Sequence, residues 1–545
     1  MPSHPTSIWR RSPNKLRQSE IWLEYFYFTS LFLASLILFL INLGELPLLD
    51  LDEGIVAQVA KEIYQQSDRL GSWIFPTLWG QPYLEQPPLI HGLIAIAYKV
   101  AGVNEFATRF PGALLGAISV VCVYNIGREI FVARFPALCS ALIYLTCLPV
   151  VRFSRLAMSD GPLLCFELIT IWAILRSRRD LRWSLMAGIG LGLMSLTKGV
   201  VTLQITVVII GFLLWDTPRL LASPYFLGGL LLGATPGIGW YAAQGIHYYE
   251  LNTVGDIFNL FMGQISPNNL DSEFTLQYYL TQSLQYIFPW AIIMLAGLKL
   301  ASHNVHWGWG KLIVVWIGVY LTLILLTLNQ DYWSILPLYP GLALAGGRQL
   351  DLVNNLPSYV NYPQVWTYSF ALMAAIAAFA GLHWGIRDYV DFYLPFICGS
   401  LAITFAATAI VIAQQEKQFI PLLFWGLFVS IFLSIVSPHW IWELKAIEPV
   451  KPIATLIRQY TPKEQIIYSA MSQARPSLSF YSDRRIINQE LAELKTHWQE
   501  DPKHHLDVYL LVDSAAIKQL EIPSQMIVAG DKSQSLDWML AIKKS

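Results

Sequence analysis

Two adjacent carboxylates, Asp52 and Glu53, open the segment DEGIVAQVAKEIYQQ and are the first residues along the chain that could do chemistry. A carboxylate can accept a proton from a hydroxyl group, orient that group or bind a cation. The structural alternative is that Asp52 caps the following helix and that Glu53 is a solvated acid of its first turn. Ile55, Val59 and Ile63 recur every four residues, which predicts a short amphipathic helix suited to lying along a membrane surface.

The segment QPYLEQPPL, residues 81–89, presents Tyr83 and Glu85 beside an apolar stretch. Its prolines predict an irregular backbone near the membrane, which is tolerated only where protein packs around it or where it lines a wet cavity. There Glu85 would offer base or metal-binding capacity. The alternative is an ion pair of Glu85 with Arg152 or Arg155.

Cations and a further acid follow in RFSRLAMSDGP, which carries Arg152, Arg155 and Asp160, and in LTKG, which carries Lys198. Ionisable groups at the membrane edge are expensive unless they are paired or functional. Arginine and lysine suit a phosphate, so these cations together with the acids predict a pocket for a lipid phosphate bearing a sugar. The alternatives are snorkelling of Arg152 and Lys198 to headgroups and a helix N-cap role for Asp160.

The composition indicates a membrane scaffold for these side chains. Of 545 residues, 55% are hydrophobic and only 13% are charged, and the repeated long apolar stretches predict a polytopic α-helical membrane protein. The net charge of −1 and the dispersed basic residues give no indication of nucleic-acid binding. The five cysteines lie inside apolar stretches without metal-binding spacing and are expected to be buried thiols.

Thirteen stretches are near the length that crosses about 30 Å of hydrocarbon. They are predicted at 21–43, 106–126, 131–150, 160–176, 183–197, 200–215, 224–243, 284–300, 311–328, 334–350, 364–383, 393–413 and 419–438. Basic residues concentrate in cytoplasmic loops. The basic N-terminus and the arginines of 176–182 lie on the same side of the membrane only if 89–102 does not cross it. We therefore predict that 89–102 is a re-entrant or interfacial helix. This topology places the N-terminus in the cytoplasm, and the first apolar stretch is expected to be retained as a span.

Two long connections then lie on the outer face, at 44–105 and 244–283. The second contains acids but no lysine or arginine, as the distribution of basic residues requires of an outer loop. After residue 440 the composition becomes polar, with short apolar stretches between helix-like segments. This predicts a membrane domain at 1–440 and a small extracytoplasmic α/β domain at 441–545.

Five motifs in fixed order give the chain a resemblance to a known family. DEG…AxxAKE, YLEQPPL, RxxRLAMSDxPL, LTKG and ILPLYPGLALAGG, within about residues 20–440, resemble the membrane glycosyltransferases of the GT-C type. Within that type the motifs resemble those of the bacterial aminoarabinose lipid A transferases and the protein O-mannosyltransferases of glycosyltransferase family 39. The resemblance implies a GT-C fold in a bacterial inner membrane and a polyprenyl-phosphate-linked sugar donor. It also implies transfer with inversion at the outer face to a lipid, glycan or protein acceptor.

The resemblance also assigns roles to residues. Asp52 matches the family's catalytic carboxylate and Asp160 its second acid, while Glu85 resembles a glutamate that binds a metal in some members. Gln86 stands where many relatives have a lysine near the donor phosphate, and Asp256 aligns loosely with a metal-binding histidine. The predicted site therefore comprises catalytic Asp52, Glu53 and Asp160; substrate-binding Tyr83, Gln86, Arg152, Arg155 and Lys198; and metal-binding Glu85 and Asp256. Oxygen ligands favour Mg²⁺ or Mn²⁺ over Zn²⁺.

The reaction expected from this set is attack of an acceptor oxygen on the anomeric carbon of the sugar. Asp52 would orient or deprotonate the acceptor, and Lys198, Arg152 and Arg155 would stabilise the leaving polyprenyl phosphate. A transporter or flippase of lipid-linked sugars is the main alternative, and it should show internal repeats and charged or broken mid-span helices. A structural assembly protein would leave the clustered outer ionisable groups unexplained.

Overall fold

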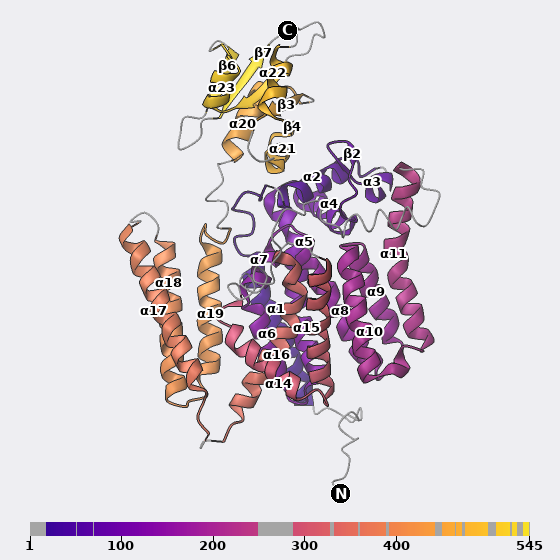
Figure 1. Cartoon of the computed structure of the whole chain (residues 1–545), viewed down its shortest axis with the longest axis vertical. Helices are drawn as coiled ribbons and strands as arrows, with labels where there is room; N and C mark the ends of the chain where they lie inside the picture. Colours follow the sequence, from indigo (N-terminus) through magenta and orange to yellow (C-terminus); the bar gives the residue numbers. More distant parts are fainter. Residues whose placement is uncertain are drawn as a thin grey trace.

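A computed structural model describes residues 18–50, 52–68, 70–248, 287–327, 332–357, 360–387, 392–441, 450–463, 465–470, 475–499, 508–523, 526–530 and 538–543. Most of them are helical, and the larger of the hydrophobic cores lies among the long helices drawn upright in Figure 1. Those helices are α1 (Gln18–Leu40), α5 (Glu105–Ile130), α6 (Arg134–Leu145), α8 (Asp160–Ser177), α9 (Trp183–Ser195), α10 (Gly199–Asp216), α11 (Pro224–Tyr248), α14 (Ala291–His303), α15 (Gly308–Thr327), α16 (Tyr339–Asn354), α17 (Gln364–Arg387), α18 (Tyr393–Ala413) and α19 (Phe419–Val436).

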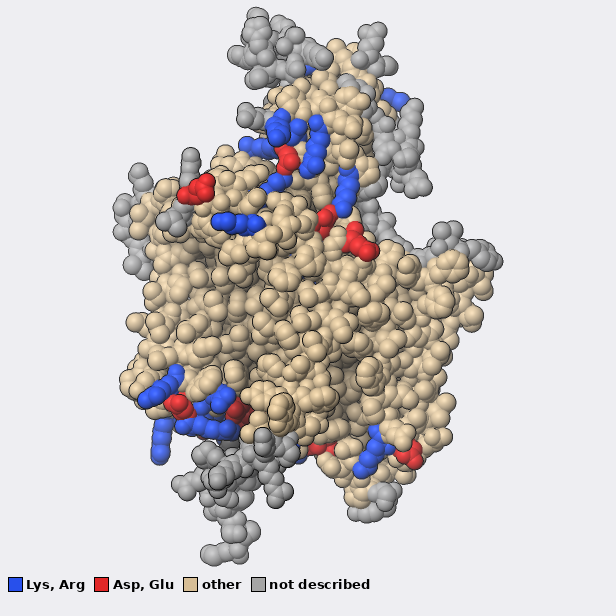
Figure 2. Space-filling view, turned by 180° about the vertical axis from the view of Figure 1, so that it is seen from behind, with Lys and Arg blue, Asp and Glu red and all other residues tan. Residues whose placement is uncertain are grey.

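Among the described residues, seven helices are long and apolar enough to cross a membrane. The number is eight if α6 and α7 (Leu148–Arg155), which meet at an angle of 59°, form one broken span. Each of the thirteen predicted stretches overlaps a helix, but thirteen crossings stay a prediction because several of these helices are short or carry charges. Figure 2 shows lysine, arginine and acidic side chains gathered toward the two ends of the bundle, with a largely uncharged middle on that face. This pattern is typical of a membrane protein.

Three short helices lie across the end of the bundle nearer the C-terminus (Figure 1): α2 (Asp52–Gln65), α3 (Leu70–Ile74) and α4 (Leu89–Ala101). Between α3 and α4, the strands β1 (Thr77–Leu78) and β2 (Gln81–Pro82) form a small antiparallel hairpin. At 13 residues α4 is too short to cross the hydrocarbon, in keeping with the re-entrant or interfacial helix expected at 89–102.

Helix α2 is covered by protein, and its position along a membrane surface stays a prediction. It packs on α4 and on α21 (Pro476–Ser482) of the C-terminal region. Even its polar residues Lys61 and Glu62 are buried. Gly54 is required at this contact, because a Cβ there would lie 2.6 Å from the backbone nitrogen of Ser477. The apolar spacing of α2 therefore corresponds to its packing against α4 and α21.

The C-terminal region contains a five-stranded mixed sheet in the order β4-β3-β5-β7-β6. Its strands are β3 (Ile466–Ser469), β4 (Arg485–Asn488), β5 (Val508–Val512), β6 (Ile527–Gly530) and β7 (Met539–Lys543); its helices are α20 (Val450–Tyr460), α21, α22 (Leu491–Gln499) and α23 (Ser514–Gln519). Strand β3 runs parallel to β4 and β5, and β7 runs antiparallel to β5 and β6.

Strand alternation divides this sheet between two cores. Tyr509 and Leu511 of β5 pack with residues of α20 and α21, while Leu510 and Val512 pack with residues of α22 and α23. Each face of β5 is therefore covered by helices. The domain boundary at 441 and the side of the membrane on which the sheet lies stay predictions.

Candidate active site

Glu53, the second residue of α2, is held in a buried ion pair with Arg109 of α5. Both side chains are fully buried. Arg109 Nε lies 2.8 Å from Glu53 Oε1, and Nη2 lies 2.6 Å from Oε2. The remaining Arg109 donors reach the backbone oxygens of Leu43, Leu46 and Pro47. The guanidinium group is thus satisfied by the carboxylate and by the loop that leads into α2.

Two backbone groups complete the environment of Glu53. Leu49 N donates to Oε2 at 2.9 Å, and Ala157 N donates to Oε1 at 2.8 Å. The alternative of a solvated first-turn acid is therefore wrong, since protein groups occupy both oxygens. We infer from this geometry that Glu53 is a positioning residue. It fixes the start of α2 against the segment between α7 and α8.

Asp52 and Asp160 are brought into one neighbourhood by this contact. Ala157 lies three residues before Asp160, a reach of at most about 11 Å of extended chain. Asp52 is the first residue of α2 and is half-buried, so its carboxylate lies at the N-terminal end of that helix. Helix dipoles favour an anion at that position. The Glu53–Ala157 hydrogen bond thus links the helix that begins at Asp52 to the segment that leads into Asp160.

Asp160 pairs with Lys198, whose Nζ lies 3.0 Å from Asp160 Oδ1. The side chain of Asp160 is 7% exposed and that of Lys198 is 21% exposed. Asp160 is the first residue of α8, and the N-cap is Ser159, so the N-cap alternative for Asp160 is wrong. The snorkelling alternative for Lys198 also fails, because its ammonium group binds a carboxylate of the protein.

The QPYLEQPPL segment lies next to LTKG. Leu89 N donates to the backbone oxygen of Leu196 at 3.3 Å, which joins the start of α4 to the end of α9 two residues before Lys198. The Gln86 side chain is half-buried, and its Oε1 has no hydrogen-bond partner among the described residues. An unsatisfied buried acceptor is expensive. It is therefore a place where a ligand hydroxyl would be favoured.

Tyr83 is part of a small core, in contrast to its predicted place in an open site. It is buried with Val59, Ile63 and Ala95, and its ring lies edge-on to His91 at 5.4 Å between centroids. Burial, and then the charge of Glu85, raises the pKa of the Tyr83 phenol, which therefore stays protonated at neutral pH. Tyr83 thus packs QPYLEQPPL against α2 and α4.

Arg152 and Arg155 are both buried on α7, so snorkelling of Arg152 is excluded. Arg155 Nη1 donates to Leu38 O at 2.6 Å, and its guanidinium carbon lies 4.4 Å from the ring centroid of Trp440. Its Nε and Nη2 have no hydrogen-bond partner in the described part of the chain. Trp440 also lies 5.1 Å from the Arg109 guanidinium, so the two arginines share this ring.

The predicted metal site stays a prediction. Glu85 is exposed, and Asp256 lies outside the described residues. Over the described ranges, no three His, Cys, Asp or Glu side chains are grouped closely enough to hold a metal ion. The five cysteines are free thiols; all are buried except Cys398, which is half-buried.

The docking of α21 on the start of α2 was not predicted from the sequence. The Ser477 hydroxyl donates to Asp50 Oδ1, and Lys61 pairs with Asp483. Tyr481 Oη accepts from Leu48 N at 2.9 Å and donates to Glu105 Oε1 at 3.0 Å. Burial raises the pKa of Asp50, against the lowering effects of the Ser477 bond and the charge of Arg475. Through these contacts the C-terminal region helps to hold the start of α2, the helix that begins at Asp52.

Arg109 was also missed, although a signal for it exists. It stands inside the predicted span 106–126, where an ionisable side chain is unfavourable without a partner. An arginine at this position therefore predicts a buried carboxylate as its partner. The sequence offers several acids in the outer loops, and only the fold selects Glu53.

Known proteins share sequence and fold with this chain. The family described as dolichyl-phosphate-mannose-protein mannosyltransferase matches residues 85–240. A solved structure of ArnT from Cupriavidus metallidurans, bound to undecaprenyl phosphate, superposes with a TM-score of 0.75 at 17% identity, covering 94% of this chain and 97% of that one. The chain has the GT-C fold. The archaeal oligosaccharyltransferase AglB from Archaeoglobus fulgidus shares the fold more distantly, with a TM-score of 0.51 at 11% identity.

Two relatives match the chain in sequence. An uncharacterised protein from Aquifex aeolicus is 23% identical over 477 residues, covering 84% of this chain and 87% of that protein. An undecaprenyl phosphate-α-4-amino-4-deoxy-L-arabinose arabinosyl transferase from Pseudomonas fluorescens is 26% identical over 321 residues, 55% of each chain. The match thus spans about half the length of that transferase. The predicted resemblance to the aminoarabinose lipid A transferases and O-mannosyltransferases is confirmed.

Proposed function

We propose that this chain is a membrane glycosyltransferase that moves a sugar from a polyprenyl-phosphate donor to a lipid, glycan or protein acceptor. The observation that carries the proposal is the junction of the Asp160–Lys198 pair with the start of α2, through the Glu53–Ala157 hydrogen bond. It links the helix that begins at Asp52 to the segment that carries the Asp160–Lys198 pair, which supports a shared role for Asp52 and Lys198. The Pseudomonas fluorescens relative is named as an undecaprenyl phosphate-aminoarabinose arabinosyl transferase, and the similar ArnT structure holds undecaprenyl phosphate. Both support this donor class.

In the proposed reaction the acceptor oxygen attacks the anomeric carbon from the face opposite the phosphate. The bond between the anomeric carbon and the phosphate oxygen breaks, and its electron pair leaves with polyprenyl phosphate. Asp52 takes the proton of an acceptor hydroxyl, or orients an acceptor that is already ionised. Lys198 offsets the charge on the leaving phosphate, and Asp160 holds the lysine in place. A single displacement of this kind inverts the anomeric configuration.

Buried Arg152 and Arg155 contribute to the same electrostatic field rather than presenting an exposed cation. Two cations at the end of α7 raise the positive potential near the phosphate position. Gln86, with its unsatisfied oxygen, is proposed to accept from a donor hydroxyl. A divalent cation at Glu85 and Asp256, Mg²⁺ or Mn²⁺, would add Lewis-acid stabilisation of the phosphate. Glu85 fits this role as an exposed oxygen ligand.

The proposal includes the topology predicted from the basic residues. The chain lies in a bacterial inner membrane with thirteen spans and a cytoplasmic N-terminus, and the C-terminal sheet is extracytoplasmic. Asp52, Asp160 and the 244–283 loop are then on the outer face. A cysteine introduced at Asn268 should react with a membrane-impermeant reagent added from outside. Labelling only from the cytoplasmic side would contradict this topology.

The function is tested with purified full-length protein and undecaprenyl-phosphate sugars. Incubation with donor and a membrane extract should release undecaprenyl phosphate and transfer the labelled sugar to an extractable acceptor. Mass spectrometry of envelope lipids and glycans from a deletion strain then identifies the missing sugar. Movement of intact donor across proteoliposomes, without cleavage of the sugar–phosphate bond, would instead support the flippase. The matched proteins give no support to that alternative.

A further inference from the structure

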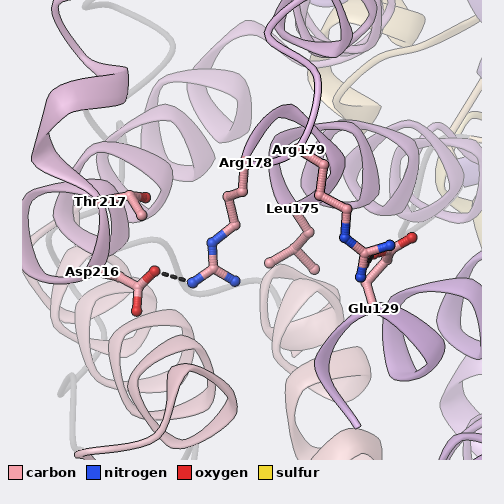
Figure 3. A pocket seen from close by; sticks show the side chains of 6 residues that line it. All are labelled: Glu129, Leu175, Arg178, Arg179, Asp216 and Thr217. Atoms are coloured by element: carbon pink, nitrogen blue, oxygen red, sulfur yellow. Dashed lines mark hydrogen bonds and ion pairs between the residues drawn. The ribbon is translucent and has the colours of Figure 1, made fainter. Parts of the chain in front are cut away.

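A polar cavity lies at the end of the bundle away from α2. Its volume is about 320 Å³, and it is lined by Glu129, Leu175, Arg178, Arg179, Asp216 and Thr217 (Figure 3). These residues come from the ends of α5, α8 and α10 that are opposite Glu105, Asp160 and Lys198. The cavity is therefore separate from the candidate active site by the length of these helices, and no step of the proposed reaction uses it.

Each of the two carboxylates at the cavity pairs with two cations. The cations are Arg176, Arg178, Arg179 and Lys311, and the carboxylates are Glu129 and Asp216. Arg178 pairs with Asp216, whose Oδ1 also lies 3.4 Å from Lys311 Nζ. Arg179 Nη2 lies 2.9 Å from Glu129 Oε2. The lining itself carries two arginines and two carboxylates, and Arg176 and Lys311 pair with the same two carboxylates from outside it.

The two arginines are arranged around the cavity in a way that suits a phosphate. Figure 3 shows Arg178 and Arg179 descending on either side of Leu175, one toward Asp216 and the other toward Glu129. Each carboxylate pairs with one of the two guanidinium groups and competes with a bound anion for it. The hydroxyl of Thr217 is buried and has no hydrogen-bond partner among the described residues. It can donate to an anionic oxygen.

Apolar and aromatic side chains beside the cavity indicate a ligand with a lipid tail. Leu214 and Trp215, next to Asp216 on α10, are 60% and 48% exposed. The Arg176 guanidinium lies 4.5 Å from the ring of Trp183 and 5.4 Å from that of Trp172. Tryptophans of this kind gather at the membrane–water interface. The cavity thus opens where a headgroup and an acyl chain would meet the protein.

We propose that this cavity binds the phosphate headgroup of an anionic membrane phospholipid, with an acyl chain along the exposed face of α10. Basic pockets between membrane helices are suited to such headgroups. Arginine is the side chain best suited to bidentate phosphate binding. Under the predicted topology the lipid belongs to the cytoplasmic leaflet. The site would anchor the α8–α10 end of the bundle independently of sugar transfer.

The test measures the thermal midpoint of the full-length protein in detergent with added phosphatidylglycerol, phosphatidylcholine or inorganic phosphate. Phosphatidylglycerol should raise the midpoint in a saturable manner, and phosphatidylcholine should not. The same rise with millimolar inorganic phosphate would assign the site to a free anion and overturn the lipid proposal. Equal rises with both lipids would show a general detergent effect and overturn it as well.

Substitutions at the cavity test whether its charged residues bind the lipid or only stabilise the fold. Arg179→Gln should weaken apparent binding of phosphatidylglycerol about tenfold, as loss of a charge-assisted contact implies. Glu129→Gln should strengthen binding, because it removes a competing carboxylate and gives the lining a net positive charge. Lys299→Gln is the matched control, since Lys299 is exposed on α14 and does not line the cavity. A structural ion-pair cluster without a ligand would show no change in lipid binding in either cavity variant.

Discussion

The carboxylate of Glu53 and the guanidinium group of Arg109 form a bidentate ion pair in which neither side chain is exposed. The pair joins the start of α2 to α5, and its hydrogen bond from Ala157 extends the link to the α7–α8 segment. Every donor and acceptor in it is satisfied, which is the condition under which a buried pair is tolerated. This buried polar junction therefore fixes α2, α5 and the α7–α8 segment against one another at the candidate active site.

Removing one partner of this junction should be costly. Arg109→Met leaves the Glu53 carboxylate buried without its counter-charge, and the expected loss of stability is about 3–5 kcal/mol. The measurement is the thermal midpoint and the yield of folded protein after detergent extraction. Arg128→Met is the matched control at the other end of α5, where Arg128 pairs with the partly exposed Glu24 and should cost less. Equal losses in both variants would contradict the role of the junction.

Replacement of Lys198 should weaken donor binding. Lys198→Met removes the cation beside Asp160, and we expect about tenfold weaker binding of undecaprenyl phosphate. Lys198→Arg should retain part of the affinity, because it retains the charge. Titration of undecaprenyl phosphate by native mass spectrometry measures the effect, with Lys99→Gln as a control for an exposed lysine on α4. Unchanged affinity in Lys198→Met would remove Lys198 from the phosphate site.

The sequence predicted the features of this site that depend on apolar length and motif order, but not those that depend on packing between distant segments. Apolar length and motif order predicted the helices and placed Asp52, Asp160 and Lys198 near one rim, because spans of fixed length set which end of a helix a residue occupies. Local spacing could not show that Glu53 is buried by Arg109, that Tyr83 packs in a core, or that α21 covers α2. The Glu53–Arg109 and Lys61–Asp483 contacts join residues 56 and 422 positions apart, and the core around Tyr83 combines residues of α2, α4 and the loop between them. Long-range packing selects them among many chemically equivalent partners.

The α21 contact should affect turnover as well as stability. Tyr481→Phe leaves Leu48 N without its acceptor and removes the bond to Glu105, a loss of about 1–3 kcal/mol. Because Leu48 leads into α2, we expect kcat to fall while donor affinity changes less. Tyr460→Phe, at an exposed position on α20, serves as the control. A normal kcat in Tyr481→Phe would show that the docking of α21 only stabilises the fold.

Asp50 should give this contact a pH dependence. Burial holds the pKa of Asp50 above its ordinary value of 3.8. The folded protein therefore binds the proton more tightly than the unfolded chain. This contribution to stability is fully present below the unfolded pKa and is lost as pH rises through the folded pKa. Thermal midpoints compared between wild type and Asp50→Asn from pH 7 down to pH 4 should show wild type gaining relative to the variant. A pH-independent difference would contradict the prediction.

Asp52 carries the central claim, and one substitution separates its two interpretations. A residue that only stabilises the start of α2 is replaceable by asparagine with little loss, because the amide oxygen still accepts a hydrogen bond. A general base needs a proton-accepting carboxylate, which asparagine lacks. The measurement is transfer of a labelled sugar from undecaprenyl phosphate by Asp52→Asn, beside undecaprenyl-phosphate binding on the same preparation. We predict a folded protein that binds the lipid normally and transfers the sugar at least about 100-fold more slowly; turnover near that of wild type would contradict the assignment of Asp52 as the catalytic carboxylate.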